Sequence, residues 1–167
     1  HLAVDRAGNL YILDNGRPPI LGARIRKVTP DGIIQTIAGN GLPSLAADGR
    51  PATPFRLPYA IAGNDVPGLV ADGIPATAAS FSIVYAIAVD SAGNLYIADK
   101  GNALIRKVDT KGIIRTIAGN GQSTPLGLGP QTPDGPALAT QLLLSGLALD
   151  RADNLYLTDG NRVRRLL

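Results

Sequence analysis

Hydrophobic and polar residues alternate in short runs along most of this chain, and one pattern of alternation occurs three times. Its copies begin at Leu2, Ile87 and Leu147 and read "LAVDRAGNLYILD", "IAVDSAGNLYIAD" and "LALDRADNLYLTD". In each copy, two apolar runs containing Leu, Val, Ile or Tyr flank a short polar turn, which is typical of a β-hairpin. Each copy therefore predicts two antiparallel strands joined by a tight loop.

A second repeated phrase follows the first and predicts another hairpin. It reads "RIRKVTPDGIIQTIAGNG" over 24–41 and "LIRKVDTKGIIRTIAGNG" over 104–121, and a shortened copy, "RVRRLL", covers 162–167. Turn residues separate the two apolar runs of each full copy, and no stretch has a convincing helical period. The two phrases together predict a meander of four short strands.

A third phrase, rich in Pro and Gly, lies between these units. It reads "ADGRPAT" over 47–53, "ADGIPAT" over 71–77 and "PDGPALAT" over 133–140. It lacks the series of acidic ligands of a calcium-binding loop, and the glycine-rich stretch near residue 120 has no Lys-Ser/Thr ending for a phosphate cradle. We interpret these segments as turns within long connections.

The phrases "GNLYIAD", "LIRKV" and "IAGNG" resemble the NHL repeat, and the "ADGxPAT" phrase is similar to the long-linker NHL repeats of bacterial multi-repeat proteins and teneurins. The resemblance implies that each unit is a four-stranded blade of a β-propeller. We therefore expect an all-β fold: a partial, open propeller of about two full four-stranded blades plus a partial third, with long Pro/Gly-rich connections. Propellers usually need four to eight blades to close.

The predicted domain organisation is uneven. Sequence spacing places a blade at 2–41, a degenerate linker at 42–84, a blade at 85–121, a long connection at 122–145 and a partial blade at 146–167. In the linker, Ile61 matches both the start and the end of a unit, which indicates a deletion of about half a blade. We expect a fragment of a larger repeat protein; an assembling protomer and an open array of sheets are the alternatives.

Aspartates recur at two positions of the unit. The first set follows the first strand and can cap the hairpin turn through backbone amides: Asp5, Asp90 and Asp150. For the second set, the NHL resemblance implies contacts with the arginine of the second phrase, within or between blades: Asp14, Asp99 and Asp159 with Arg26, Arg106 and Arg164. Because every unit repeats these residues, we interpret them as architectural.

Composition excludes several kinds of chemistry. The 167 residues contain no Cys, a single His and no Glu, so thiol catalysis, a histidine triad and a multi-histidine metal site are all excluded. We predict no catalytic residue, no metal and no cofactor. The net charge of +3 is spread along the chain and aromatic residues are few, so nucleic-acid binding is not expected. No apolar run is long enough to cross a membrane.

These observations favour a non-catalytic NHL module that recognises a protein, peptide or glycan, or that acts as a scaffold. Two alternatives stay open: part of a propeller lyase or hydrolase whose active-site residues lie in other blades, and a structural spacer of a surface protein. Further blades of a parent chain or self-association are possible partners. The lack of Cys and the resemblance to secreted bacterial proteins favour an extracellular, periplasmic or cell-surface location.

Overall fold

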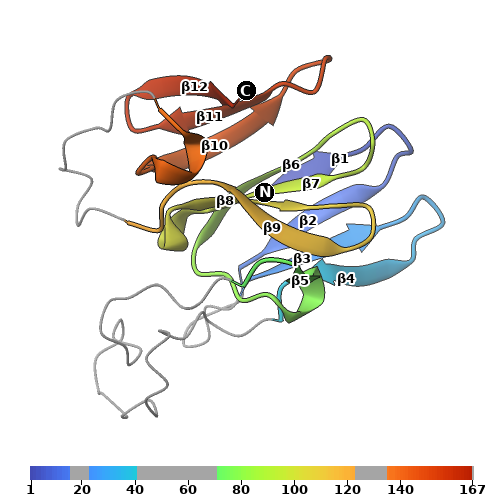
Figure 1. The fold of residues 1–167 in the computed structure, drawn as a ribbon. Coiled ribbons are helices and arrows are strands. Elements are labelled where there is room, and N and C mark those ends of the chain that lie inside the picture. Colours follow the sequence, from blue (N-terminus) through green and yellow to red (C-terminus); the bar gives the residue numbers. More distant parts are fainter. Residues whose placement is uncertain (16–22, 41–70, 123–134, 167) are drawn as a thin grey trace, which may run out of the picture.

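The structure is a computed structural model that describes residues 1–15, 23–40, 71–122 and 135–166. These residues form three antiparallel sheets joined in chain order, with three short 3-10 helices in the connections (Figure 1). The expected all-β, open propeller-like architecture is confirmed, because three separate sheets are present and they form no closed barrel. No helix among the described residues is long and apolar enough to span a membrane.

The first sheet contains one complete meander. Its strands lie in the order β1-β2-β3-β4, and their bounds are Leu2–Val4, Leu10–Asp14, Arg24–Val28 and Ile34–Ala38. The first phrase of the sequence forms the β1–β2 hairpin and the second forms β3–β4.

The middle sheet repeats this meander and adds a strand. Strands β6 to β9 span Val84–Val89, Leu95–Asp99, Leu104–Val108 and Ile113–Ala118. A further strand, β5 (Ile74–Pro75), pairs with the outer edge of β9. The sequence predicted only four strands here and assigned these two residues to a linker. The difference arises because the "ADGIPAT" phrase also contributes backbone hydrogen bonds to the sheet, from Gly73 N to Ile114 O at 2.8 Å and from Ala76 N to Gly112 O at 2.8 Å.

The third sheet has three strands in the order β10-β11-β12. They span Leu144–Leu149, Leu155–Asp159 and Arg162–Leu166. The 3-10 helices are η1 (Ala76–Ala78), η2 (Lys100–Asn102) and η4 (Ala137–Ala139). Strand β10 begins two residues before the predicted start of the partial blade at 146. The predicted deletion near Ile61 lies outside the described residues.

Two apolar layers hold the three sheets together. Alternate residues of a strand point to opposite faces, and β7 uses both faces. Leu95 and Ile97 belong to a cluster with side chains of the first sheet, such as Ile25, whereas Tyr96 and Ala98 belong to a cluster with side chains of the third. All five residues of β7 are buried. The middle sheet is therefore packed between the two outer sheets.

The Pro-Ala segment after each long connection joins neighbouring sheets. Gly39, at the end of β4, donates its amide to Ala76 O at 2.9 Å, and Gly119, at the end of β9, donates to Ala137 O at 2.9 Å. Both glycines have positive φ, and a Cβ on Gly119 would lie 2.1 Å from the carbonyl oxygen of Ala103. The glycine of the "AGN" sequence is thus required where the chain leaves one blade and meets the next.

Candidate interaction surfaces

The first set of repeated aspartates organises the hairpin turns. In the middle sheet, Asp90 Oδ1 accepts the amides of Ala92 and Asn94, while its Oδ2 accepts Asn94 Nδ2 at 2.8 Å and the Tyr96 hydroxyl at 3.2 Å. Asp5 and Asp150 accept the corresponding four hydrogen bonds in the other two sheets. Every acceptor position of these carboxylates is therefore used within its own turn.

These bonds hold the turn aspartates in their charged form. Burial raises the pKa of Asp90, but hydrogen bonds from Asn94 and Tyr96 outweigh it, so the net pKa lies below the ordinary value. Tyr11 donates its hydroxyl to Asp5, and burial together with this hydrogen bond raises the pKa of Tyr11 to about 12. Tyr11 and Tyr96 thus remain neutral donors, and Lys27 Nζ lies 5.8 Å from the Tyr11 ring centroid. They serve as packing and hydrogen-bonding residues of the hairpins.

The repeated arginines do not have the same partner in each sheet. In the third sheet, Arg164 Nε lies 2.8 Å from Asp159 Oδ2, a contact between adjacent strands. In the middle sheet, the ion pair of Arg106 is with Asp72 at 3.0 Å rather than with Asp99. Asp72 belongs to the third phrase, and the same oxygen also accepts Thr116 N and Oγ1. In the middle sheet, the ion pair therefore connects the linker to the blade.

Asp99 lies fully buried at the end of β7. It accepts the amide of Ser82 at 3.1 Å and Asn102 Nδ2 at 2.7 Å. Burial raises the pKa of this carboxyl to about 6, although the two hydrogen bonds and the charge of Arg106 act in the opposite direction. Asp159 accepts the corresponding amide, that of Leu143, at 2.6 Å. In the middle and third sheets, this position therefore holds the chain just before the first strand of the meander.

Asp14 and Arg26 of the first sheet form no ion pair with each other. The register places Asp14 opposite Arg24 and Arg26 opposite Ile12, so the two side chains are diagonal neighbours on adjacent strands. Arg26 Nε is buried without a hydrogen-bond partner among the described residues. Among the described residues, the third sheet has the direct Asp–Arg contact that the resemblance implies.

One exposed cluster departs from the repeat. Tyr85, at the start of β6, is 48% exposed, Lys100 Nζ lies 4.2 Å from its ring centroid, and Ile83 beside it is 52% exposed. The equivalent of Tyr85 in the third sheet is Ser145. We call Ile83, Tyr85 and Lys100 the aromatic patch. It lies at the end of the middle sheet opposite the Asp90 turn.

The aromatic patch was not among the candidate residues predicted from the sequence. The signal was available, because the third unit has Ser145 and Gly160 where the middle unit has Tyr85 and Lys100. Sequence reasoning concentrated on the residues that the units share. Those shared residues have structural partners, as the turn carboxylates show.

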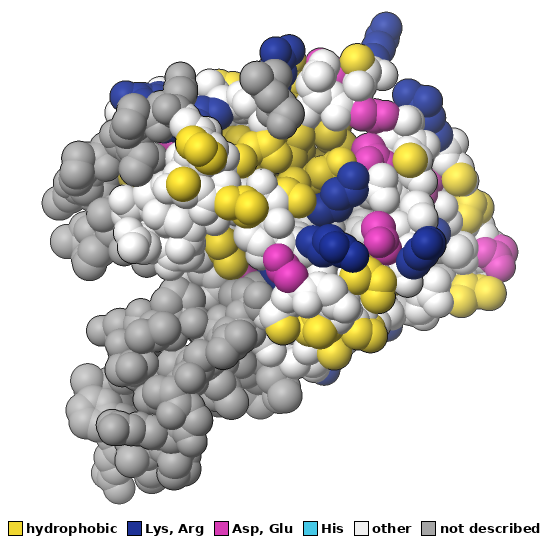
Figure 2. Space-filling model, viewed as in Figure 1, with side chains coloured by type: hydrophobic (Ala, Val, Ile, Leu, Met, Phe, Trp, Pro, Cys, Tyr) yellow, Lys and Arg dark blue, Asp and Glu magenta, His cyan; other side chains and the backbone are white. Residues whose placement is uncertain are grey.

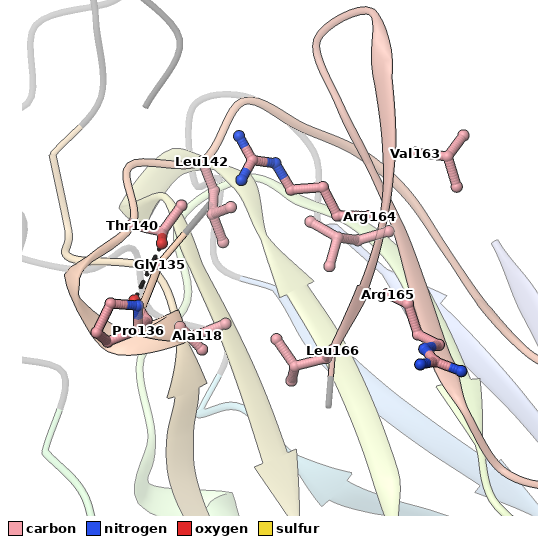
Figure 3. A pocket seen from close by; sticks show the side chains of 11 residues that line it. Ala118, Gly135, Pro136, Thr140, Leu142, Val163, Arg164, Arg165 and Leu166 are labelled. Atoms are coloured by element: carbon pink, nitrogen blue, oxygen red, sulfur yellow. Dashed lines mark hydrogen bonds between the residues drawn. The ribbon is translucent and has the colours of Figure 1, made fainter. Parts of the chain in front are cut away.

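A cavity of about 560 Å³ opens beside β12, next to the apolar layer between the middle and third sheets (Figure 3). It is lined by both small apolar residues and arginines: Ala118, Gly135, Pro136, Ala137, Thr140, Leu142, Leu157, Val163, Arg164, Arg165 and Leu166. Figure 3 shows the guanidinium of Arg165 directed away from the apolar side chains of Leu142 and Leu166. Figure 2 shows hydrophobic side chains gathered in a hollow between the third sheet and the rest of the molecule.

Among the described residues, no three His, Cys, Asp or Glu side chains gather into a group that could hold a metal ion. The single histidine, His1, contributes its Nδ1 at 3.5 Å from the amide of Ile87. In the described part of the chain, the Ser91 hydroxyl donates a hydrogen bond to the Asp153 carboxylate.

Comparisons with known proteins agree with the fold. A family model for the teneurin NHL domain matches residues 67–166. No curated protein matches the sequence significantly.

Three solved structures illustrate the shared architecture. An auxiliary nutrient binding protein from Bacteroides thetaiotaomicron VPI-5482 has a TM-score of 0.57 at 13% identity, over 99% of this chain and 36% of its own. A protein of unknown function from the same organism has a TM-score of 0.54 at 18% identity, over 98% and 46%. A luciferin-regenerating enzyme has a TM-score of 0.51 at 15% identity, over 99% and 41%. This chain thus spans less than half of each of them.

Proposed function

Because the chain belongs to the teneurin NHL domain family, we propose that it is a non-catalytic propeller module that recognises a protein, peptide or glycan ligand, or holds partners in place. This proposal rests on the difference between the polar residues that all units share and the aromatic patch, which belongs to one unit. The shared carboxylates and tyrosines are hydrogen-bonded inside the turns, whereas the aromatic patch of the middle sheet is exposed.

The aromatic patch suits recognition. Exposed aromatic side chains provide large, rigid contact areas, and they are enriched among residues that dominate binding energy. The Lys100 ammonium stacked on the Tyr85 ring adds a hydrogen-bond donor beside this apolar surface. Such a combination fits a ligand with an apolar face and polar groups, which peptides and glycans both offer. We further propose that the module acts outside the cytoplasm.

To identify a ligand, the chain is screened against a glycan array and a phage-displayed peptide library. The affinity of a selected ligand is then measured by calorimetry for the wild type, Tyr85→Ala and Arg106→Ala. Tyr85→Ala should weaken binding at least about tenfold while changing stability by less than about 0.5 kcal/mol.

Arg106→Ala provides the converse control. Arg106 is fully buried and bound to Asp72, so its removal should lower the thermal unfolding temperature and leave affinity unchanged at temperatures where the variant is folded. A selected ligand that loses affinity with Arg106→Ala and keeps it with Tyr85→Ala would contradict the proposal. Turnover of small ester or lactone probes would contradict the non-catalytic role and support the alternative of a propeller lyase or hydrolase.

A further inference from the structure

One buried arginine of the middle sheet lies near two carboxylates. Arg106 of β8 has no exposed surface, and its Nη2 donates to Asp72 Oδ1 at 3.0 Å and to Ala71 O at 3.1 Å. Its Nε and Nη1 are buried with no hydrogen-bond partner among the described residues. The charge of Asp99 also acts on the guanidinium. Because a buried charge without an opposite charge is strongly destabilising, Arg106 needs at least one of the two carboxylates.

The two carboxylates lie on opposite sides of β8. Arg106 is paired with Ile97 of β7, and Asp99 comes two residues later on the same face of that strand. On the other side, Thr116 of β9 stands opposite Arg106, and Asp72 Oδ1 accepts both its amide and its Oγ1. The arginine side chain therefore extends toward β9 to bind Asp72, and it would have to turn toward β7 to bind Asp99.

The third sheet shows that an arginine at this position can reach the strand-end aspartate. Leu157 is paired with Arg164 as Ile97 is paired with Arg106. Arg164 Nε lies 2.8 Å from Asp159 Oδ2. The backbone geometry of the repeat therefore permits a second conformation in which the arginine of the middle sheet is turned toward β7.

In the middle sheet, Asn102 occupies the position of that arginine on the aspartate. The Oδ1 atoms of Asp99 and Asp159 both accept a backbone amide from just before the first strand of the meander. The other oxygen, Oδ2, accepts Asn102 Nδ2 at 2.7 Å in the middle sheet and contacts Arg164 Nε in the third. The neutral amide of Asn102 thus satisfies the buried carboxylate and leaves Arg106 available to the linker.

The linker segment that Arg106 binds is short and weakly held. We call residues 71–75 the strap; it includes β5, in which only two residues pair with β9. Gly73 donates its amide to Ile114 O at 2.8 Å, and Ala76, directly after the strap, is buried in the apolar core. The strap is therefore anchored by the core at one end and by the ion pair of Asp72 at the other.

We propose that Arg106 is a two-state switch that attaches and releases the strap. While Asn102 is bound to Asp99, Arg106 binds Asp72 and the strap covers the outer edge of β9. When Asn102 leaves, Arg106 turns to Asp99 and the strap detaches, which exposes a strand edge that can pair with other segments. This inference goes beyond the proposed recognition role, because it concerns a strand edge and not the ligand surface.

The test measures amide hydrogen exchange in the full 167-residue chain by NMR at pH 7, above the pKa of about 6 of Asp99. The reporters are the Gly73 amide, which binds Ile114 O, and the Thr116 amide, which binds the strap carboxylate. Asn102→Ala should speed the exchange of both amides at least about tenfold, because the freed aspartate then attracts the arginine away from the strap.

A second substitution separates the switch from a loosened loop. In the double variant Asn102→Ala/Asp99→Asn, β7 offers no charge to Arg106, so exchange at both reporters should return to within about threefold of the wild type. If Asn102 only stiffened its connection, the second substitution would repair nothing. Asn161→Ala, in the corresponding connection of the third sheet, is the matched control and should leave both reporters unchanged.

Asp99→Asn alone keeps the test valid if Asn102→Ala fails to fold. It removes the competing charge, so the Gly73 amide should exchange at least about twofold more slowly than in the wild type. Three outcomes would overturn the proposal: unchanged exchange at both reporters in Asn102→Ala, no recovery in the double variant, or no slowing in Asp99→Asn.

Discussion

At the scale of single residues, the same carboxylate has opposite properties at two positions of one repeat. Asp90 accepts four hydrogen bonds in its turn and has a lowered pKa. Asp99 lies at the buried end of β7, and its pKa is raised to about 6 because burial outweighs its two hydrogen bonds. Asp90 thus favours the folded state when charged, whereas charging Asp99 opposes folding.

The stability of the wild type and that of the Asp99→Asn variant should depend differently on pH. Between the ordinary pKa of 3.8 and the folded value of about 6, the folded chain keeps a proton on Asp99 that the unfolded chain has released. The free energy of unfolding of the wild type should therefore fall as pH rises through this range, by up to about 3 kcal/mol relative to Asp99→Asn.

Urea unfolding at several pH values between 4 and 7 measures this difference. The other carboxylates are common to both proteins, so their contributions cancel in the comparison. Parallel stability curves for the wild type and Asp99→Asn would show that burial does not raise the pKa of this carboxyl.

The partner of a side chain could be predicted from the sequence only where the two residues lie close together along the chain. The partners of Asp90 lie within six residues of it, so the repeated phrase alone suggested a turn cap. The partner of Arg106 is 34 residues away in a linker, and nothing local identifies it. The resemblance implied Asp99 as the partner, which lies nearby in the sheet but is hydrogen-bonded to Ser82 and Asn102 instead.

At the scale of strands and turns, the repeated "AGN" sequence places a glycine where a side chain would clash with the backbone. Gly119 has a φ of +93° and lies so close to the preceding strand that a Cβ would be 2.1 Å from Ala103 O. Gly121 has a φ of +77° but has no atom within 4 Å of such a Cβ. Replacing Gly121 by Ala therefore tests the cost of the backbone conformation alone. Replacing Gly119 by Ala adds the cost of a steric clash.

Alanine substitutions at Gly119 and Gly121 should destabilise the chain to different extents. Gly121→Ala should destabilise the chain by about 1–2 kcal/mol, the cost of a left-handed conformation for a residue with a Cβ. Gly119→Ala should cost more, because backbone atoms must also move apart and the bond from its amide to Ala137 O is disturbed. Chemical denaturation of both variants measures the difference, and equal losses would contradict the close approach described here.

The elements themselves were largely predictable, because both hairpins of a blade have strong local signals. Alternating apolar residues and turn residues indicated the strands from β1 to β4 and from β6 to β12. Strand β5 was not predicted, because two residues that include Pro75 carry no strand signal. β5 pairs with β9 because the linker folds back onto the edge of the middle sheet.

At the scale of the whole molecule, the middle sheet is the structural centre. Its side chains enter both apolar layers, while each outer sheet contributes to one of them. The outermost side chains are correspondingly open to solvent: Leu2 and Val4 of β1 are 60% and 63% exposed, and Val163 of β12 is 72% exposed. The sequence indicated that the blades must stack, but it could not show which faces would remain uncovered.

The most direct test of this open architecture is residue-resolved amide hydrogen exchange by NMR, in dilute solution. Strand β8 is paired on both sides, by β7 and β9, whereas β12 is paired only by β11 within the described part of the chain. We expect continuous slow exchange along β8 and alternating slow and fast exchange along β12, where the amides that do not face β11 point outward. Equally slow exchange along the whole of β12 would show that its edge is covered and would contradict an open third sheet.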